Sequence, residues 1–173
     1  MAEAKILVAQ KEGIVQIRVV GRATFKISRS LREYAIGAVR KGITSLTVDL
    51  SECQGMDSTF IGVLAMIGLE ANTDTELVIV NARESHRKLL SSIGVARLWH
   101  FTEEPVADVN WKSLCEAAGG VADMQKLGPT VIAAHKTLMD LEPENVPKFK
   151  DVVDMLSAET EENETEENEG TTP

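Results

Sequence analysis

The sequence predicts an α/β fold: a mostly parallel sheet of four to five strands with interleaved helices, followed by an all-helical C-terminal extension. Two observations lead to this prediction. Over the first ~100 residues, strand and helix patterns alternate in the order β-β-α-β-α-β-α, which implies crossover connections and parallel strand pairs. Residues 77–80 form a continuous, largely β-branched apolar run, typical of a central strand that is buried on both faces.

A hairpin is predicted at the start of the chain. Val15, Ile17 and Val19 alternate with polar residues, and this period of two indicates a half-buried strand. Its antiparallel partner is predicted at residues 6–8, on the other side of a turn at Gly13.

The next elements continue the alternation of strands and helices. A helix is predicted to begin after Ser30, which can cap its N-terminus, and to end at Gly42. Residues 46–50 and 77–80 are predicted strands, and residues 86–98 form a predicted amphipathic helix.

The helix predicted after Asp57 is apolar almost all the way round. A helix that packs on one sheet needs only one apolar stripe. Such a stripe is supplied by Phe60, Leu64, Ile67 and Ala71. The opposite side carries Ile61, Ala65 and Leu69. Either the C-terminal segment or a partner must cover this second face, and the sequence leaves both alternatives open.

The chain divides into three predicted parts: a domain over residues 1–105, a helical extension over 106–157, and an acidic tail over 158–173. In the extension, apolar residues recur at helical spacing near residues 111–121, 131–138 and 149–156. The tail is expected to be disordered, because it has no large apolar residue to bury.

Charge and composition exclude several classes of function. The 18 basic and 27 acidic residues give a net charge of −9, so bulk electrostatics disfavours binding to nucleic acid or to an anionic membrane. Much of the excess acid lies in the tail. We expect a cytoplasmic bacterial protein, because the sequence has neither a recognisable export signal nor an apolar run that spans a bilayer. The two cysteines form no metal-binding pair, so no metal or cofactor is expected.

Catalytic chemistry has little support in the sequence. No serine, histidine and aspartate set and no paired carboxylates stand out. His86, His100 and His135 lie in different segments and are expected to be core or surface residues. The sequence therefore indicates a binding module rather than an enzyme.

The segment around Asp57 has two interpretations. Asp57 caps the unpaired N–H groups of a helix, and Ser58 and Thr59 are tolerated in its first turn. Alternatively, one of these hydroxyl groups carries a regulatory phosphate, which a helix N-terminus accommodates and which adds about −1.5 to −2 charges. The residue pattern leaves both interpretations open.

The same segment resembles the signature of STAS domains, the anti-sigma factor antagonists. Two stretches match: residues 48–51, Val-Asp-Leu-Ser, and residues 56–64, Met-Asp-Ser-Thr-Phe-Ile-Gly-Val-Leu. The family pattern reads hydrophobic-Asp-Leu-Ser and then Met-Asp-Ser-Ser-Gly-Leu-Gly-hydrophobic-Leu. Asn81 and the helix that ends at residues 93–94 also fit. The resemblance implies a STAS-like fold for the first domain.

The resemblance also implies which residues carry the function. The family's serine after the motif aspartate is phosphorylated, and this serine is Ser58 here, with Thr59 as the second choice. Thr59 and Phe60 replace a serine and a glycine of the family pattern, so the start of the helix is bulkier. The implied partner-binding residues are Asp57, Ser58, Thr59, Phe60, Ile61 and Ala65.

The implied function is that of an anti-sigma factor antagonist in a partner-switching pathway. The unphosphorylated chain would bind an anti-sigma serine kinase with a histidine-kinase-like ATP site, and phosphorylation at Ser58 would release it. A PP2C-type phosphatase is a further implied partner, and a homodimer stays open. The alternative is a STAS scaffold subunit of a stressosome-like or other regulatory assembly. A receiver domain phosphorylated on aspartate is disfavoured, because residues 9–10 offer no acidic pair for Mg²⁺.

Overall fold

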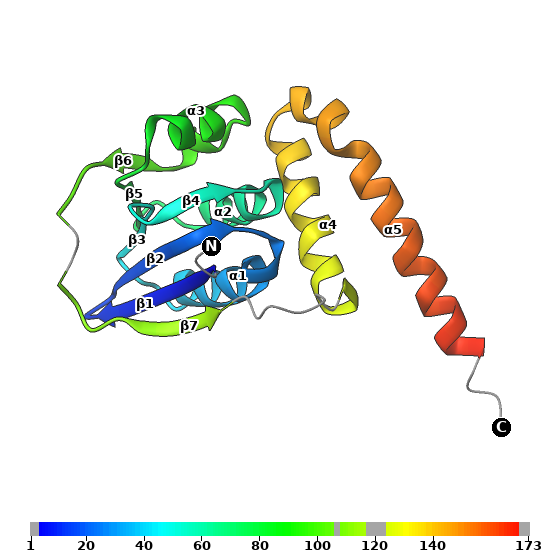
Figure 1. Ribbon diagram of the computed structural model, residues 1–173, viewed down its shortest axis with the longest axis horizontal. Helices are drawn as coiled ribbons and strands as arrows, with labels where there is room; N and C mark the ends of the chain where they lie inside the picture. Colours follow the sequence, from blue (N-terminus) through cyan, green and yellow to red (C-terminus); the bar gives the residue numbers. More distant parts are fainter. Residues whose placement is uncertain (1–3, 106–107, 117–123, 170–173) are drawn as a thin grey trace.

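The computed structural model describes residues 4–105, 108–116 and 124–169 (Figure 1). These residues contain seven strands: β1 (Lys5–Lys11), β2 (Ile14–Ala23), β3 (Ser45–Asp49), β4 (Cys53–Met56), β5 (Glu76–Val80), β6 (His100–Thr102) and β7 (Lys112–Glu116). They also contain the α-helices α1 (Phe25–Arg40), α2 (Ser58–Glu70), α3 (Glu84–Ser92), α4 (Met124–Leu141) and α5 (Val146–Glu169). Two short 3-10 helices are η1 (Val95–Leu98) and η2 (Pro143–Asn145).

The sheet is mixed, with a parallel centre. Its strand order is β6-β5-β3-β2-β1-β7, and β4 pairs with β2 off this path. The pairs from β2 to β6 are parallel, whereas β1 is antiparallel to both β2 and β7. Because the crossovers from β2 to β6 proceed across the sheet in one direction, right-handed connections place α1, α2 and α3 on the same face.

The predicted α/β architecture is confirmed, but the sheet is larger than expected. The sequence indicates four clear strands, and the structure adds β4, β6 and β7. β4 and β6 have only four and three residues, too few to show a period in the sequence.

β7 corrects the expectation that residues 106–157 are all helical. Residues Lys112–Glu116 pair with β1, for example Ile6 with Cys115, and a register shift follows at Leu7. β1 would otherwise present an unpaired edge, and this distant pairing satisfies its backbone groups. The rest of the helix expected near residue 121 lies outside the described residues.

α5 corrects the expectation of a disordered tail. The helix continues through the acidic segment to Glu169, so the expected disorder is wrong for residues 158–169. Glutamate is a good helix former, and a helix that is already nucleated by packed residues extends at little cost. The hydroxyl groups of Thr160 and Thr165 also donate to carbonyls one turn earlier.

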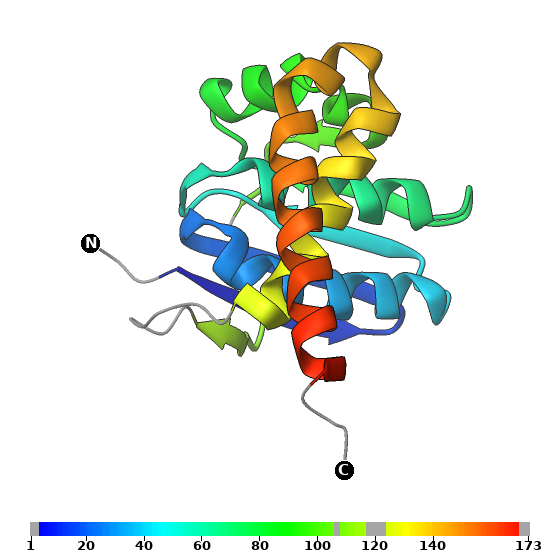
Figure 2. The same cartoon turned by 90° about the vertical axis from the view of Figure 1, so that its right-hand side faces the viewer.

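The C-terminal helices form a hairpin that covers α2, which answers the question left open by the sequence. α4 lies against α1 and α2, and α5 packs on α4 (Figures 1 and 2). The two helices approach closely at Gly62, where a side-chain methyl carbon would lie 2.5 Å from the Ala134 carbonyl oxygen. Among the apolar side chains of the hairpin helices, Ala134 and Leu138 of α4 are completely buried and Val153 of α5 is 5% exposed.

Leu138→Ala should lower the free energy of unfolding by about 2–5 kcal/mol, because Leu138 is fully buried and its truncation leaves a cavity. Urea denaturation followed by circular dichroism measures this change. Met155→Ala is the control on α5, where the side chain is 58% exposed, and should change stability by less than about 0.5 kcal/mol. Equal stabilities of the two variants would contradict a docked hairpin.

Candidate functional site

The candidate site lies where β4 leads into α2. β4 runs parallel to the end of β2, and the Asp57 N–H donates to the Ala23 carbonyl oxygen over 2.9 Å. This pairing brings the N-terminus of α2 beside the N-terminus of α1, which begins directly after Thr24.

The Asp57 carboxylate caps both helices at once. One oxygen, Oδ1, accepts from the Phe60 N–H of α2 over 2.9 Å, and the other, Oδ2, accepts from the Phe25 N–H of α1 over 2.8 Å. The negative charge also lies at the positive ends of two helix dipoles. The predicted cap of α2 is therefore confirmed.

The same contact explains why α1 begins earlier than predicted. The sequence places a cap at Ser30, but the helix starts at Phe25, and Thr24 makes no side-chain capping bond. The cap comes instead from Asp57, which is distant in the sequence.

Ser58 is half-buried, and its hydroxyl group contacts His135 of α4. The Ser58 Oγ and His135 Nε2 atoms are 2.8 Å apart. The other ring nitrogen, Nδ1, lies 2.7 Å from the Val131 carbonyl oxygen, which can only accept. In the neutral ring the proton is thus on Nδ1, so the Ser58 hydroxyl donates to Nε2.

The other predicted partner-binding residues on α2 are buried. Thr59 is 4% exposed, and Phe60 is completely enclosed. Ile61 and Ala65, which the sequence places on the second face of α2, are at most 1% exposed. The structure thus keeps Asp57 and Ser58 together at the partly accessible start of the helix and encloses the remaining four residues.

His135 is the site residue that the sequence did not reveal. It lies 77 residues from Ser58, in a segment without a motif, where the sequence predicts an ordinary core or surface residue. Its ring is 3% exposed and is stacked at a tilt against Phe149 of α5, with 5.3 Å between ring centroids. Only the docking of the hairpin brings it to Ser58.

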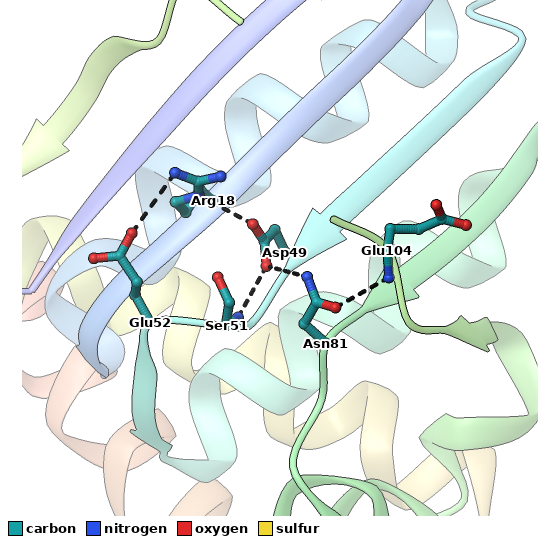
Figure 3. A network of polar contacts seen from close by, with 6 residues as sticks. All are labelled: Arg18, Asp49, Ser51, Glu52, Asn81 and Glu104. Carbon is teal, nitrogen blue, oxygen red and sulfur yellow. Dashed lines mark hydrogen bonds and ion pairs between the residues drawn. The ribbon is translucent and has the colours of Figure 1, made fainter. Parts of the chain in front are cut away.

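A partly buried polar network supports the loop that leads into β4 (Figure 3). Asp49, at the end of β3, accepts from Arg18 Nε over 3.0 Å and from the Ser51 N–H over 2.9 Å. Asn81, after β5, donates to Asp49 and accepts from the Glu104 N–H. The network therefore ties together the carboxyl ends of β3, β5 and β6.

Burial raises the pKa of Asp49, but the hydrogen bonds from Ser51, Asn81 and Arg18 outweigh this effect. The net result is a pKa below the ordinary value of 3.8. Arg18 is itself enclosed, with its guanidinium carbon 4.4 Å from the centroid of the Trp111 ring. These contacts make Asp49 a structural anchor for the adjacent Leu50–Glu52 loop.

The chemistry open to the Ser58 hydroxyl group depends on its pairing with His135 and on the space around it. A serine that donates to a histidine resembles a nucleophile with its base, but catalysis also requires a substrate cleft. Three cavities in the part of the chain that the structure describes lie away from Ser58, including one of about 360 Å³ between Thr47 and Trp111. Among the described residues, no cluster of metal-ligating side chains occurs and no helix has the length and apolar character of a membrane span.

Asp57→Ala should lower the free energy of unfolding by about 1–4 kcal/mol, because each lost cap costs about 0.5–2 kcal/mol. Asp57→Asn retains one acceptor oxygen and should lose less. Asp151→Ala, an exposed substitution on α5, serves as the control. Chemical denaturation measures all three, and a loss no larger than that of the control would refute the double cap.

Asp49 should make the fold sensitive to acid. Because its pKa is lower in the folded chain, its ionisation stabilises the fold fully above pH 3.8, and this contribution is lost as the pH falls through the folded-state pKa. Asp49→Asn should therefore be less stable at neutral pH and should lose less stability below about pH 4 than the parent. Denaturation midpoints from pH 7 to pH 2 test this, with exposed Asp140→Asn as the control. If the denaturation midpoints of the parent and Asp49→Asn changed in parallel with pH, ionised Asp49 would not stabilise the fold as expected.

Comparison with known proteins agrees with this architecture. The STAS domain family model matches residues 5–107. An anti-sigma factor antagonist from Mycobacterium paratuberculosis superimposes with a TM-score of 0.51 at 20% identity, covering 61% of this chain and 88% of that chain. The Bacillus cell fate determinant SpoIIAA in its phosphorylated form gives a TM-score of 0.48 at 18% identity, covering 58% of this chain and 91% of that chain. No curated protein matches the sequence.

The family assignment rests on the agreement between the family model and the observed fold. The matched residues include β1 to β6 and α1 to α3, and they contain the Asp57-Ser58 site at the start of α2. The chain belongs to the STAS domain family, and its sheet and first three helices form the matched domain.

Proposed function

We propose that this chain is an anti-sigma factor antagonist in a cytoplasmic partner-switching pathway. In this proposal the unphosphorylated chain binds an anti-sigma serine kinase through the start and second face of α2. Phosphorylation at Ser58 releases the kinase, and a PP2C-type phosphatase restores the binding form. The observation that carries the proposal is the position of Ser58, a half-buried hydroxyl group in the first turn of α2, directly after the doubly capping Asp57.

Exposure favours Ser58 over Thr59 as the phosphorylated residue. Thr59 is 4% exposed, so a kinase would have to unfold the first turn of α2 to reach its hydroxyl group. Ser58 is more exposed than Thr59, and the contact of its hydroxyl group is with a side chain of α4, His135, and not with the body of α2.

Phosphate at Ser58 would change the charge at the start of α2 without unfolding the domain. The helix N-terminus tolerates an anion, because its first N–H groups and its dipole favour negative charge. The added −1.5 to −2 charges would, however, lie directly beside the Asp57 carboxylate and next to the apolar second face of α2. A partner that buries this region would lose affinity, since an unmatched buried charge is costly.

The proposal assigns the chain a binding role and no reaction of its own. Ser58 and His135 are paired, and Ser58 lines none of the three cavities described above. Modification by a second protein is the chemistry that this half-buried hydroxyl group supports best.

Substitution of Ser58 should separate kinase binding from phosphorylation. Ser58→Ala should bind the kinase and accept no phosphate, whereas Ser58→Asp should bind about 100- to 1,000-fold more weakly, the cost of one unmatched interfacial charge. Intact mass after incubation with the kinase and Mg-ATP measures incorporation, and calorimetry measures affinity.

Thr59→Val is the matched control, because it removes a buried hydroxyl group while keeping the side-chain shape. This variant should be phosphorylated at the rate of the parent. Phosphate incorporation into Ser58→Ala at the parental rate would contradict the assignment of the site.

A further inference from the structure

We infer that the hairpin of α4 and α5 is an internal competitor for the partner-binding surface, so that a kinase reaches Ser58 and α2 only after the hairpin undocks. The inference rests on the proposed function and adds a regulatory step to it. The surface concerned consists of Ser58 and the second face of α2, and its occupant in this structure is α4.

The first observation is that a side chain of α4 forms a hydrogen bond with the Ser58 hydroxyl group, the proposed site of phosphorylation. Ser58 Oγ lies 2.8 Å from His135 Nε2, and the Val131 carbonyl oxygen fixes the ring from the other side. Phe149 of α5 packs against the same ring. Phosphorylation replaces the hydroxyl hydrogen that Ser58 donates to Nε2 and places three further oxygens beside this contact, so it disfavours the docked arrangement.

The second observation is that α4 covers the apolar face on which a partner would dock. Ile61 and Ala65 are at most 1% exposed, and Gly62 touches the backbone of α4 at Ala134. The contact leaves no room for an intervening side chain. A protein that binds this face must therefore replace α4.

The third observation is that the sheet does not depend on the hairpin. Every strand of the described sheet pairs with another strand, and α4 and α5 contribute none of them. At its far end the hairpin is fastened by an exposed ion pair between Arg97 of η1 and Glu142, and by a bond from Asn145 to the carbonyl oxygen of Ile93 at the end of α3. Exposed ion pairs contribute weakly to stability, so the apolar contact with α2 is the main target for opening the hairpin.

The opening of the hairpin and the binding of a partner to α2 are linked equilibria, because a docked hairpin and a bound partner exclude each other. A partner that binds only the open form has its affinity reduced by the fraction of chains that are open, and a partner or phosphate on α2 favours undocking by the same factor. The rate of Ser58 phosphorylation should therefore follow the open fraction of the hairpin.

Two substitutions in the full-length chain are designed to weaken the contact between α2 and α4, one on each helix. Gly62→Ala places a methyl group against the Ala134 carbonyl, and its matched control is Gly37→Ala in α1, where nothing lies within 4 Å. Ala134→Leu enlarges the fully buried α4 residue and leaves α2 unchanged. Its matched control is Ala158→Leu on the exposed side of α5.

Hydrogen exchange of the α4 amides measures opening, and intact mass after incubation with the anti-sigma kinase and Mg-ATP measures phosphorylation at Ser58. Both contact variants should exchange α4 amides and incorporate phosphate at least ~10-fold faster than the parent, whereas both controls should match it.

Two outcomes would overturn the inference. One is faster α4 exchange without faster phosphorylation, which would leave the proposed function intact because Ser58 would still be modified. The other is unchanged α4 exchange in both contact variants, because a hairpin that accommodates an added side chain between Gly62 and Ala134 does not undock readily.

A separate measurement distinguishes a failure of the proposed function itself. If neither the parent nor any opened variant incorporates phosphate, the kinase assignment is wrong. Access to residue 58 is then read from Ser58→Cys by peptide mapping after alkylation with N-ethylmaleimide. Alkylation should accelerate with Gly62→Ala and not with Gly37→Ala, and equal rates would refute occlusion by the hairpin.

Discussion

The carboxylate of Asp57 joins two helices that the chain places far apart in sequence. Its two oxygens accept from the first turns of α1 and α2, and its charge lies at the positive end of both helix dipoles. This bond fixes where α1 begins and how α2 leaves β4. It also places the next residue, Ser58, in the first turn of α2. A helix N-terminus tolerates negative charge. The structural cap and the proposed modification site therefore depend on the same physical chemistry.

The docking of α4 on α2 has consequences for both stability and access. An α-helix that is apolar on two faces cannot remain uncovered, and in this chain the cover is intramolecular. The glycine at position 62 permits backbone contact with Ala134, and that approach brings His135 within hydrogen-bonding distance of Ser58. The residues that would bind a partner are thus the residues that stabilise the closed chain. In this chain, the face of α2 that is proposed to bind a partner is covered by the C-terminal helices.

Much of the fold and part of the site could be predicted from the sequence because the responsible signals are local. The two-residue period of Val15 to Val19 and the apolar run at residues 77–80 indicated β2 and β5, and the helices between them implied a parallel sheet. A helix cap at Asp57 is one of the two interpretations that the sequence offers, since an acid before an apolar helical run is a short-range pattern. The two apolar faces of α2 were also evident, although their cover was not.

Tertiary structure decided what depends on residues that are distant in sequence. β7 forms because β1 offers an open edge, and α1 starts at Phe25 because Asp57 supplies its cap; neither partner is visible in the local pattern. His135 meets Ser58 only because α4 docks across α2, and a histidine without a motif gives no signal of its own. The sequence by itself determined the alternation of strands and helices and the chemistry at the start of α2. Packing decided which element covers that start. The hydrophobic effect requires that an apolar face be covered, but it does not specify which element covers it.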